Sequence, residues 1–518
     1  MRIGIDVGGT NTDAVLLDGE VVLADVKTAT SADVTSGIVN ALEALRRQRP
    51  FDPTGVNAVM LGTTHFINAI VEADRLAPTA AIRLGLPTTA ALPPLVEWPE
   101  RLVRAIGGRA YLCHGGHEFD GRIISPLKRS ELVRIAEELG EAGIRSIALS
   151  SVFSPVNAEM EQEAASILLD QLPDVHISLS HEVGRVGLLE RENATIINAC
   201  LRELAEQICT GLAQTLADAG FNAPLYLSQN DGTLMEVGYA REYPVATFAS
   251  GPTNSMRGAA FLSGLGHCVV VDVGGTTSDV GILEGGFPRE ATAEVSVGGV
   301  RTNFRMPDVL SIGIGGGSRV RTDGDLPTVG PDSVGYRLRE QARVFGGPTL
   351  TATDLAVAAG MADIGDRARV RDLDPGMVRA AVETMTAQVA SAVDQMRTSP
   401  EPLPVVLVGG GSILLTDDFP GATKVHRPDH YANANAIGAA IAQIGGEVDR
   451  IFGVEPGKRD SVLDQAKEEA TARAVAAGAE PSTVEIVDVD EVPVAYLPGN
   501  ATRIRVRAVG DLVLTSDR

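Results

Sequence analysis

Two short segments of the chain repeat one another and carry residue types suited to phosphate chemistry. DVGGTNTD at residues 6–13 returns at residues 272–279 as DVGGTTSD, with six of eight positions identical. Each copy lies between two apolar runs, as in a strand–turn–strand unit. The offset of 266 residues is about half of the 518-residue chain. Two unrelated glycine-rich hairpins are the alternative, but the length of the match favours duplication of a nucleotide-binding lobe.

A strand–Gly–Gly–Thr–strand turn lets backbone N–H groups close around a phosphate, because glycine adopts positive φ and has no side chain. Neighbouring polar side chains add further contacts. The predicted phosphate-binding residues are Gly8, Gly9, Thr10, Asn11, Thr12, Gly274, Gly275, Thr276, Thr277 and Ser278. Asp6 and Asp272, at the strand ends, are predicted to bind Mg²⁺ directly or through water, since this ion prefers oxygen ligands. Asp13 and Asp279 are candidate catalytic residues that would position an attacking group.

A third glycine-rich segment follows an apolar run in the second half. PVVLV at 404–408 leads into Gly409, Gly410, Gly411 and Ser412, and a helical pattern follows. Glycines at this point permit a close backbone approach to a ligand, and we expect the adenosine of ATP to lie there. A single Gly-Gly-Thr turn would be a weak signal, whereas two such turns and this third segment predict an ATP site.

The elements that must position these loops alternate along the chain. Amphipathic and apolar patterns predict helices and strands in turn: helices over 128–142, 157–171, 187–219, 353–362, 375–397, 432–445 and 461–478, and strands over 144–153, 175–180, 483–497 and 502–515. Such alternation indicates α/β architecture. We expect an N-terminal lobe at 1–186, a second lobe at 187–449 and a small C-terminal α/β appendage at 450–518.

Composition excludes several classes of protein. The 67 acidic and 44 basic residues give a formal charge of −23, without the basic stripes that nucleic-acid binding needs. The four cysteines form no CxxC pair, which disfavours zinc-ribbon and iron–sulfur sites. Apolar stretches fall short of a membrane span, and the N-terminus enters a strand-like run without signal-peptide features. We therefore expect a cytoplasmic protein without nucleic-acid or membrane partners.

Further motifs extend over nearly the whole chain. They are LGTT at 61–64 with Asn68-Ala69, EFDGR at 118–122, SHEV at 180–183, Glu190-Arg191 with Asn198-Ala199, QNDG at 229–232, SGP at 250–252, and SIG at 311–313 with GGGS at 315–318. The paired loops resemble those of the actin, hexokinase and heat-shock-chaperone ATPase superfamily. The full set resembles the hydantoinase A/5-oxoprolinase family. The resemblance implies a duplicated, two-lobed α/β fold with MgATP in the cleft between the lobes.

For function, the resemblance implies ATP-dependent opening of a cyclic amide such as a hydantoin, 5-oxoproline or another lactam. Phosphorylating the amide oxygen makes a poor electrophile reactive, and the protein supplies positioning and charge neutralisation. A separate partner subunit of the hydantoinase B type is implied as well, in a homo- or hetero-oligomer. An ATP-dependent ketone carboxylase subunit and a small-molecule kinase stay open as alternatives, and a nucleotide-switched regulatory module is the alternative of a different class.

Arg191, Thr195 and Asn198 are spaced i, i+4 and i+7, so they share one face of the predicted 187–219 helix. A solvated polar face is the plain interpretation. The match to the family motif favours a cleft-facing role instead, with Arg191 as a catalytic clamp for a phosphate or carboxylate and Asn198 as a substrate contact.

The remaining substrate candidates are His65, Asn68, Asn230 and Ser250. His65 could contact substrate or transfer a proton, or could be a structural histidine. Asn230 could bind substrate or belong to a plain turn, and Ser250 begins a helix whose free N–H groups suit an anion. Cys113, His114 and His117 form a short loop of possible metal ligands, but a second ligand pair is missing, so metal binding there stays open.

Overall fold

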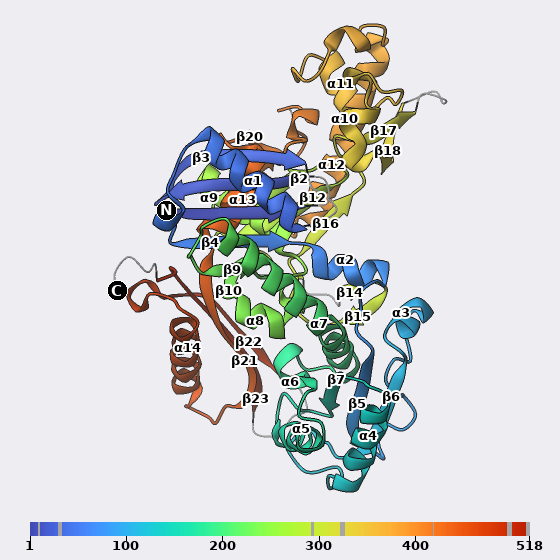
Figure 1. The fold of residues 1–518 in the computed structure, drawn as a ribbon. Coiled ribbons are helices and arrows are strands. Elements are labelled where there is room, and N and C mark those ends of the chain that lie inside the picture. The colour runs from blue at the N-terminus through green and yellow to red at the C-terminus, as the bar shows by residue number, and fades with distance from the viewer. Residues whose placement is uncertain are drawn as a thin grey trace.

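The computed structural model describes residues 1–8, 11–29, 34–291, 295–321, 327–417, 419–494 and 500–513. Figure 1 shows α11 (Ala352–Ala358) and α12 (Pro375–Met396) at one end of the molecule and α4 (Arg129–Glu141) and α5 (Glu159–Gln171) at the other. Among the described helices, none is long and apolar enough to cross a membrane.

The first large sheet has nine strands in the order β22-β23-β21-β10-β9-β4-β1-β2-β3. Its strands are β1 (Arg2–Val7), β2 (Asn11–Asp18), β3 (Val21–Ala29), β4 (Ala58–Thr63), β9 (Leu225–Ser228), β10 (Thr233–Glu236), β21 (Gln443–Gly453), β22 (Glu485–Pro493) and β23 (Ala501–Gly510). On one face, α1 (Val34–Gln48) and α7 (Leu188–Asp218) share an apolar core with β1, β2 and β4. Long β-branched and leucine-rich strands suit this buried position.

The second large sheet repeats the central topology of the first. Its strands are β11 (Cys268–Val273), β12 (Ser278–Glu284), β13 (Phe287–Pro288), β16 (Val309–Ile312), β19 (Leu403–Val408) and β20 (Ala422–His426). In both sheets the first strand pairs antiparallel with the strand after the phosphate loop and parallel with a later strand: β1 with β2 and β4, and β11 with β12 and β19. The registers match as well, with Asp6 opposite Asp13 and Asp272 opposite Asp279. The predicted duplicated, two-lobed α/β fold is confirmed.

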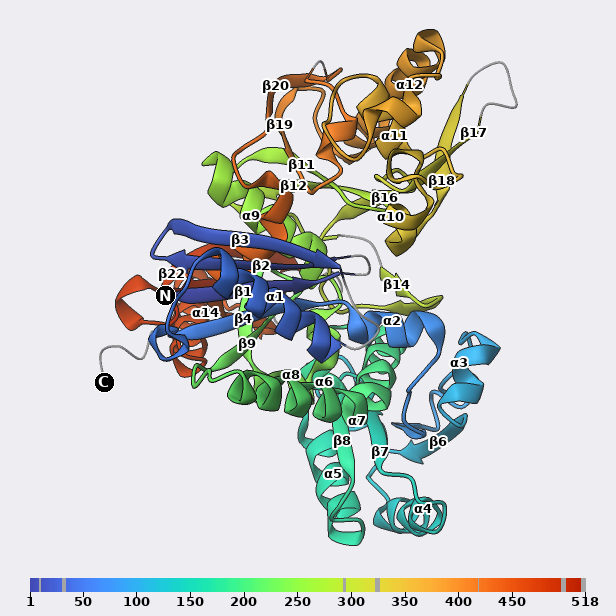
Figure 2. The same ribbon diagram turned by 45° about the horizontal axis from the view of Figure 1, so that its top comes forward.

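Two helices lie between the large sheets. α9 (Ser250–Ser263) packs on β11 and β19, and α13 (Ala434–Ile441) packs on β2. The two helices touch backbone to backbone: a Cβ atom on Gly258 would lie 1.9 Å from the Ala434 carbonyl oxygen, and one on Gly438 would lie 1.8 Å from that of Asn254. Figure 2 shows α9 between β3 and the β11–β12 hairpin, so this helix pair connects the lobes.

Smaller units extend both lobes. A parallel sheet with the strand order β6-β5-β7-β8 shares an apolar core with α4 and α5. Its strands are β5 (Thr79–Leu86), β6 (Arg109–His114), β7 (Ser146–Ser151) and β8 (His176–Leu179). The other described elements are α2 (His65–Glu72), α3 (Glu100–Ala105), α6 (Ser180–Val183), α8 (Val237–Glu242), α10 (Leu338–Gln341), β14 (Val295–Val297), β15 (Val300–Thr302), β17 (Ser318–Arg321) and β18 (Thr328–Ser333).

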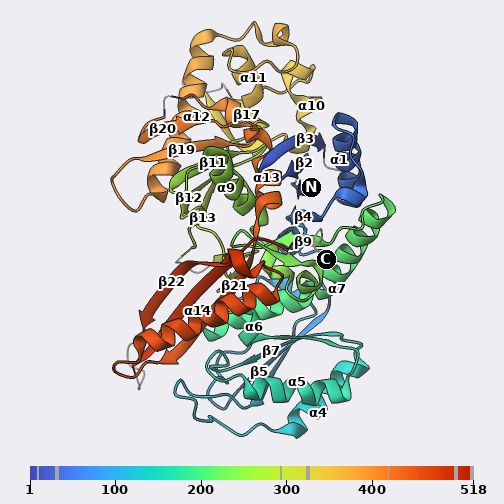
Figure 3. The same cartoon turned by 90° about the vertical axis from the view of Figure 1, so that its left-hand side faces the viewer.

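The C-terminal appendage is built from β21, β22, β23 and α14 (Arg459–Ala476). Its helix covers one face of these strands with Leu463 and a row of alanines, and Figure 3 shows α14 lying along β21. The predicted helix at 461–478 corresponds to α14, and the predicted strands at 483–497 and 502–515 correspond to β22 and β23, although residues 495–497 and 514–515 lie outside the described residues. However, β21 runs through residue 450 and joins β10, so the appendage extends the first sheet. The division at 186 and 449 stays a prediction.

Candidate active site

Equivalent backbone hydrogen bonds close the two predicted phosphate loops. The Gly8 amide donates to the Asn11 carbonyl at 3.0 Å, and the Gly274 amide donates to the Thr277 carbonyl at 2.8 Å. Gly9 and Thr10, two of the predicted phosphate ligands, lie outside the described residues. Behind the second loop, the amides of Gly316 and Gly317 donate to the carbonyls of Gly274 and Gly275 at 3.0 and 2.7 Å. These bonds give the GGGS motif at 315–318 a role in supporting the loop.

The first lobe contributes two buried carboxylates. Asp6 and Asp13 are 5% and 2% exposed, and one Asn435 Nδ2 lies 2.9 Å from an oxygen of each. Lys27, on β3, donates from Nζ to Asp13 Oδ1 and Oδ2 at 2.6 and 2.5 Å. Sequence reasoning missed both Lys27 and Asn435. The alternation of the β2–β3 hairpin could have identified Lys27, because it is the register partner of Asp13.

The second lobe contributes Asp272 and Asp279, which are half-buried. The Ser255 hydroxyl, on α9, donates to Asp272 Oδ2, and the Ser311 hydroxyl donates to Asp279 Oδ1. Ser311 belongs to the SIG motif and faces Asp279 because the two residues are register partners in β16 and β12. Hydroxyl groups therefore hold the carboxylates of this lobe, where an ammonium and an amide hold those of the other.

Burial and mutual repulsion raise the pKa values of these carboxyl groups. Burial first, then the Asp13 charge, raises the pKa of Asp6 to about 6, and Asp272 in the other lobe adds to the rise. Burial raises the pKa of Asp279 to about 6 in the same way. The pKa values of Asp13 and Asp272 are also raised by burial, and the Lys27 charge lowers both. Carboxylates from both lobes thus share one electrostatic site.

Two glycines of the sequence motifs leave room for these carboxylates. A Cβ atom on Gly62 would lie 2.3 Å from Asp6 Oδ1 and 2.4 Å from Asn254 Nδ2. A Cβ atom on Gly409, where φ is +81°, would lie 2.2 Å from Asp272 Oδ1. Asn254 is buried, and its side-chain hydrogen bond to Asp6 opposes the rise in the pKa of that carboxyl group. Sequence reasoning missed Asn254 because no motif marked it.

The predicted adenosine segment packs directly on the second phosphate loop. The Gly411 amide donates to the Val273 carbonyl at 2.7 Å, and the Gly409 amide donates to the Tyr431 carbonyl at 2.9 Å. A Cβ atom on Gly410 would meet only Lys27 Cε of the first lobe, at 3.8 Å. Ser412 is buried at the start of a short 3-10 turn. Within this arrangement Ser278 is already engaged, since its hydroxyl donates to the Ile314 carbonyl at 2.6 Å.

Comparison with known proteins identifies the family. The family model for the hydantoinase/oxoprolinase N-terminal region matches residues 2–172, and the hydantoinase/oxoprolinase family model matches residues 191–363. The chain belongs to the hydantoinase/oxoprolinase family. The resemblance inferred from the motifs is thereby confirmed.

Named relatives include enzymes of two kinds. The chain is 29% identical over 386 residues to the caprolactamase subunit alpha of Pseudomonas jessenii, covering 69% of this chain and 54% of the relative. It is 27% identical over 399 residues to the acetophenone carboxylase gamma subunit of Aromatoleum aromaticum, covering 69% and 53%. The chain spans about half the length of these curated relatives. The ATP-dependent caprolactamase structure from P. jessenii superposes with a TM-score of 0.79 at 19% identity, covering 98% of this chain and 87% of that one, which shows a shared fold.

Arg191 has a structural task in this hydantoinase-family chain. Its side chain is buried, and its nitrogens donate to the Ser180 hydroxyl at 3.0 Å and to the carbonyls of Ser151, Arg185 and Gly187 at 2.7 to 3.2 Å. The guanidinium therefore ties the start of α7 to the β7 end and the loop before α7. The clamp on a phosphate or carboxylate stays a prediction, and four of the guanidinium's hydrogen bonds go to the protein itself.

The other predicted substrate residues lie mainly in backbone-supporting positions. Asn198 Nδ2 donates to Ser178 and to the Glu242 carbonyl, so this side chain is committed to the protein. Asn230 spans the 245–249 segment, donating to the Val245 carbonyl at 3.0 Å and accepting from the Ala249 amide at 2.7 Å. Ser250 bonds to both the amide and the carbonyl of Thr63. All three are buried, and of their side-chain polar atoms only Asn198 Oδ1 is a buried atom without a hydrogen-bond partner among the described residues.

His65 and Asn68 retain more freedom. His65 Nδ1 lies 2.5 Å from the Thr63 hydroxyl, and burial followed by the Arg75 charge lowers its pKa, which favours neutral imidazole. Asn68 is exposed on α2, and its Nδ2 donates to the Thr64 hydroxyl at 3.4 Å. The short loop with Cys113, His114 and His117 does not assemble a metal site. His114 pairs with Glu131 at 2.7 Å. Among the described residues, no three His, Cys, Asp or Glu side chains converge.

Proposed function

We propose that this chain is the ATP-dependent subunit of an enzyme that phosphorylates the carbonyl oxygen of a cyclic amide and so prepares it for ring opening. The observation that carries the proposal is the pair of repeated strand–loop–strand segments with matching registers, whose carboxylates share one site between two lobes. The caprolactamase relative supports a cyclic amide as the substrate class. Hydantoin, 5-oxoproline and larger lactams all present the same amide oxygen.

The charges of the site fit Mg²⁺. Negative charge is in excess at the site. Among the groups that shift the pKa values of its four carboxyl groups, the one cation is Lys27, and the carboxyl groups are those of Asp6, Asp13, Asp272 and Asp279. Mg²⁺ is usually held by one or two carboxylates together with water and substrate phosphates, so two aspartates are enough protein ligands. Asp6 and Asp272 would hold the ion, which when bound would neutralise the phosphates of ATP.

The residues around the nucleotide then have separate tasks. Backbone amides of the two loops would cradle the phosphates, and the 409–412 segment would contact the adenosine. Asp13 is already bonded to Lys27 and Asn435, so its geometry is fixed. Asp279 makes one side-chain hydrogen bond, to Ser311, and its pKa near 6 suits proton transfer near neutral pH. We therefore assign to Asp279 the acceptance of the amide N–H proton, which the cyclic amide would lose as its oxygen bonds to the γ-phosphorus of ATP and ADP leaves.

A second candidate function uses the same chemistry on a different oxygen. The acetophenone carboxylase gamma subunit is a relative, so a ketone is a possible phosphoryl acceptor in this site. Both named relatives are subunits, which supports a partner chain that completes the reaction. A hydantoinase B-type partner and a hetero-oligomer are thus part of the proposal.

The test measures inorganic phosphate release from MgATP across hydantoins, 5-oxoproline, larger lactams and simple ketones. Each compound is assayed with and without bicarbonate, and with and without the protein encoded beside this chain. Release stimulated by one cyclic amide, with the ring-opened acid appearing in step, would support the main proposal. Bicarbonate-dependent release with a ketone would support the second function instead. Asp279→Asn should abolish stimulated release, whereas the exposed-site control Asp464→Asn should not, and failure of the wild-type chain to bind ATP would refute both functions.

A further inference from the structure

A large cavity lies away from the phosphate loops, between the C-terminal appendage and the body of the protein. Its volume is about 930 Å³, which is in the range of small-molecule sites. Body residues 181–186 and 229–236 form one wall, and residues 445–451 of β21 with Arg503 and Arg507 of β23 form the other. Two motifs that the proposed function leaves unexplained, SHEV and QNDG, therefore contribute to this wall.

The wall is rich in arginine for so acidic a chain. Six arginines line the cavity against five carboxylates, although the whole chain carries a formal charge of −23. The arginines are Arg185, Arg305, Arg450, Arg473, Arg503 and Arg507, and the acids are Glu182, Asp231, Glu236, Glu447 and Asp449. The local balance thus favours an anionic ligand over a cationic one.

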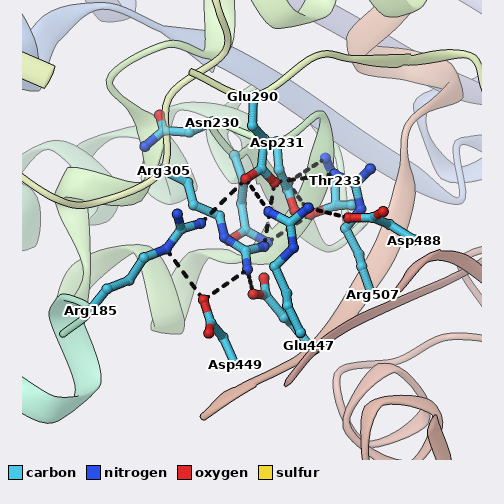
Figure 4. A network of polar contacts seen from close by, with 12 residues as sticks. Arg185, Asn230, Asp231, Thr233, Glu290, Arg305, Glu447, Asp449, Asp488 and Arg507 are labelled. Carbon is cyan, nitrogen blue, oxygen red and sulfur yellow. Dashed lines mark hydrogen bonds and ion pairs between the residues drawn. The ribbon is translucent and has the colours of Figure 1, made fainter. Parts of the chain in front are cut away.

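β23 presents three of its arginines, Arg503, Arg505 and Arg507, on one face, and two of them hydrogen-bond to carboxylates. Arg503 forms a two-point contact with Asp449 at 2.7 and 2.6 Å. Arg505 bonds to Asp488 and, at 2.5 Å, to Glu290. Figure 4 shows Glu290 at the centre of this network, with Arg305 and Arg507 beside it, and the surrounding arginines hold the pKa of Glu290 down to about 2.

Arg507 differs from its neighbours on the strand. It is 7% exposed, and its Nε and Nη1 atoms make no hydrogen bond to any described residue. Its closest ion-pair contact is Glu290 Oε1 at 3.9 Å, beyond hydrogen-bond range. The carboxylate of its register partner, Glu447, is taken by Arg305. Phe287 supports the guanidinium, whose central carbon lies 4.8 Å from the ring centroid.

We propose that this cavity binds a small carboxylate-bearing molecule, with the Arg507 guanidinium as its anchor. Arginine presents planar, paired donors that match a carboxylate, and a buried guanidinium with unused donors is costly unless a ligand satisfies them. The site does not depend on the proposed function. One cavity-lining residue contacts α9, because Thr253 Oγ1 donates to the Asn230 carbonyl at 3.1 Å.

The test is calorimetric titration of the full chain with matched acids and amides: succinate against succinamide, and 6-aminohexanoate against 6-aminohexanamide. We expect at least one acid to bind and its amide not to bind. Arg507→Gln should weaken that acid by about tenfold or more, the loss expected for a charge-assisted pair of hydrogen bonds. The control Arg473→Gln changes a cavity arginine whose donors already bond to the Glu447 carbonyl and to Glu469, and should leave the affinity nearly unchanged.

Three results would overturn the proposal: no acid binds, the amide binds as well as the acid, or Arg507→Gln binds with wild-type affinity. If Arg507→Gln does not fold, Arg507→Lys decides the matter, because it keeps the charge and loses the paired donor geometry. Binding of the acid that is severalfold weaker in Arg507→Lys would support the anchor. Unchanged affinity in that variant would refute it.

Discussion

Replacing Asp6 with asparagine should stabilise the nucleotide-free protein at neutral pH while abolishing ATP turnover. The Asp6 carboxyl is 5% exposed and lies near two further aspartates, and its pKa rises from 3.8 to about 6. That difference corresponds to roughly 3 kcal/mol of preference for the protonated form in the folded protein. At pH 7.5 the group is ionised, so the folded protein carries a cost of this order that the asparagine variant avoids.

The stabilising effect of Asp6→Asn should depend on pH. A carboxyl whose pKa is raised by folding contributes stability that is fully present below its unfolded pKa of 3.8 and is lost as the pH rises through about 6. The advantage of Asp6→Asn over wild type should therefore be largest above pH 7 and should shrink toward zero near pH 4. Asparagine keeps the size of the side chain and an oxygen that can accept from Asn435.

Urea unfolding of wild type and Asp6→Asn at pH 7.5 and pH 4.5, without nucleotide, measures the effect. Asp464→Asn, an exposed aspartate on α14, is the matched control and should change stability little at either pH. We expect a gain of about 1–3 kcal/mol in the free energy of unfolding for Asp6→Asn at pH 7.5, and roughly a third of that gain at pH 4.5. Equal stability at pH 7.5, or the same gain at both pH values, would refute the argument from a buried charge.

Three further substitutions probe other contacts of the site. Lys27→Met should lower the free energy of unfolding by about 3 kcal/mol, because it leaves the buried carboxylate of the Lys27 ion pair without its cation, and an unchanged urea midpoint would contradict this. Gly62→Ala should reduce phosphate release at least tenfold, because its Cβ would lie 2.3 Å from Asp6 Oδ1, whereas Gly410→Ala, whose Cβ meets only a lysine carbon at 3.8 Å, should retain most activity. Ser311→Ala removes a hydrogen bond that lowers the pKa of Asp279, so the acidic limb of the pH–rate profile, expected near 6, should move to higher pH, and an unmoved limb would argue against Asp279 as the proton acceptor.

The hairpins and their carboxylates could be predicted from the sequence because their geometry is local. In a strand–turn–strand unit the spacing of Asp6 and Asp13 determines that they face each other, and the same holds for Asp272 and Asp279. Helices and strands could be predicted for the same reason, because their apolar residues recur with a period of 3.6 or 2 residues and this spacing is visible within a short segment. The helix predicted at 187–219, for example, is α7 over Leu188–Asp218.

Residues that depend on distant contacts could not be predicted. The shared face of Arg191 and Asn198 was correctly inferred from their spacing, but the spacing does not say whether loops or a substrate cover that face. In the structure, the 178–187 segment and the Glu242 carbonyl cover it. Asn435 contacts Asp6 across 429 residues of chain, and no local pattern marks such a pair.

The helix pair α9–α13 explains how two duplicated loops become one asymmetric site. Asn435 of α13 binds the first-lobe carboxylates, and Ser255 of α9 binds Asp272 of the second lobe. Since Gly258 and Gly438 allow these helices to meet backbone to backbone, any change in their separation would also shift both sets of carboxylate contacts. Only the first lobe has a lysine in direct contact with its carboxylates among the described contacts, so duplication preserved the loops while the surrounding elements gave each lobe a different charge environment. That asymmetry is the physical basis for assigning positioning to Asp13 and proton transfer to Asp279.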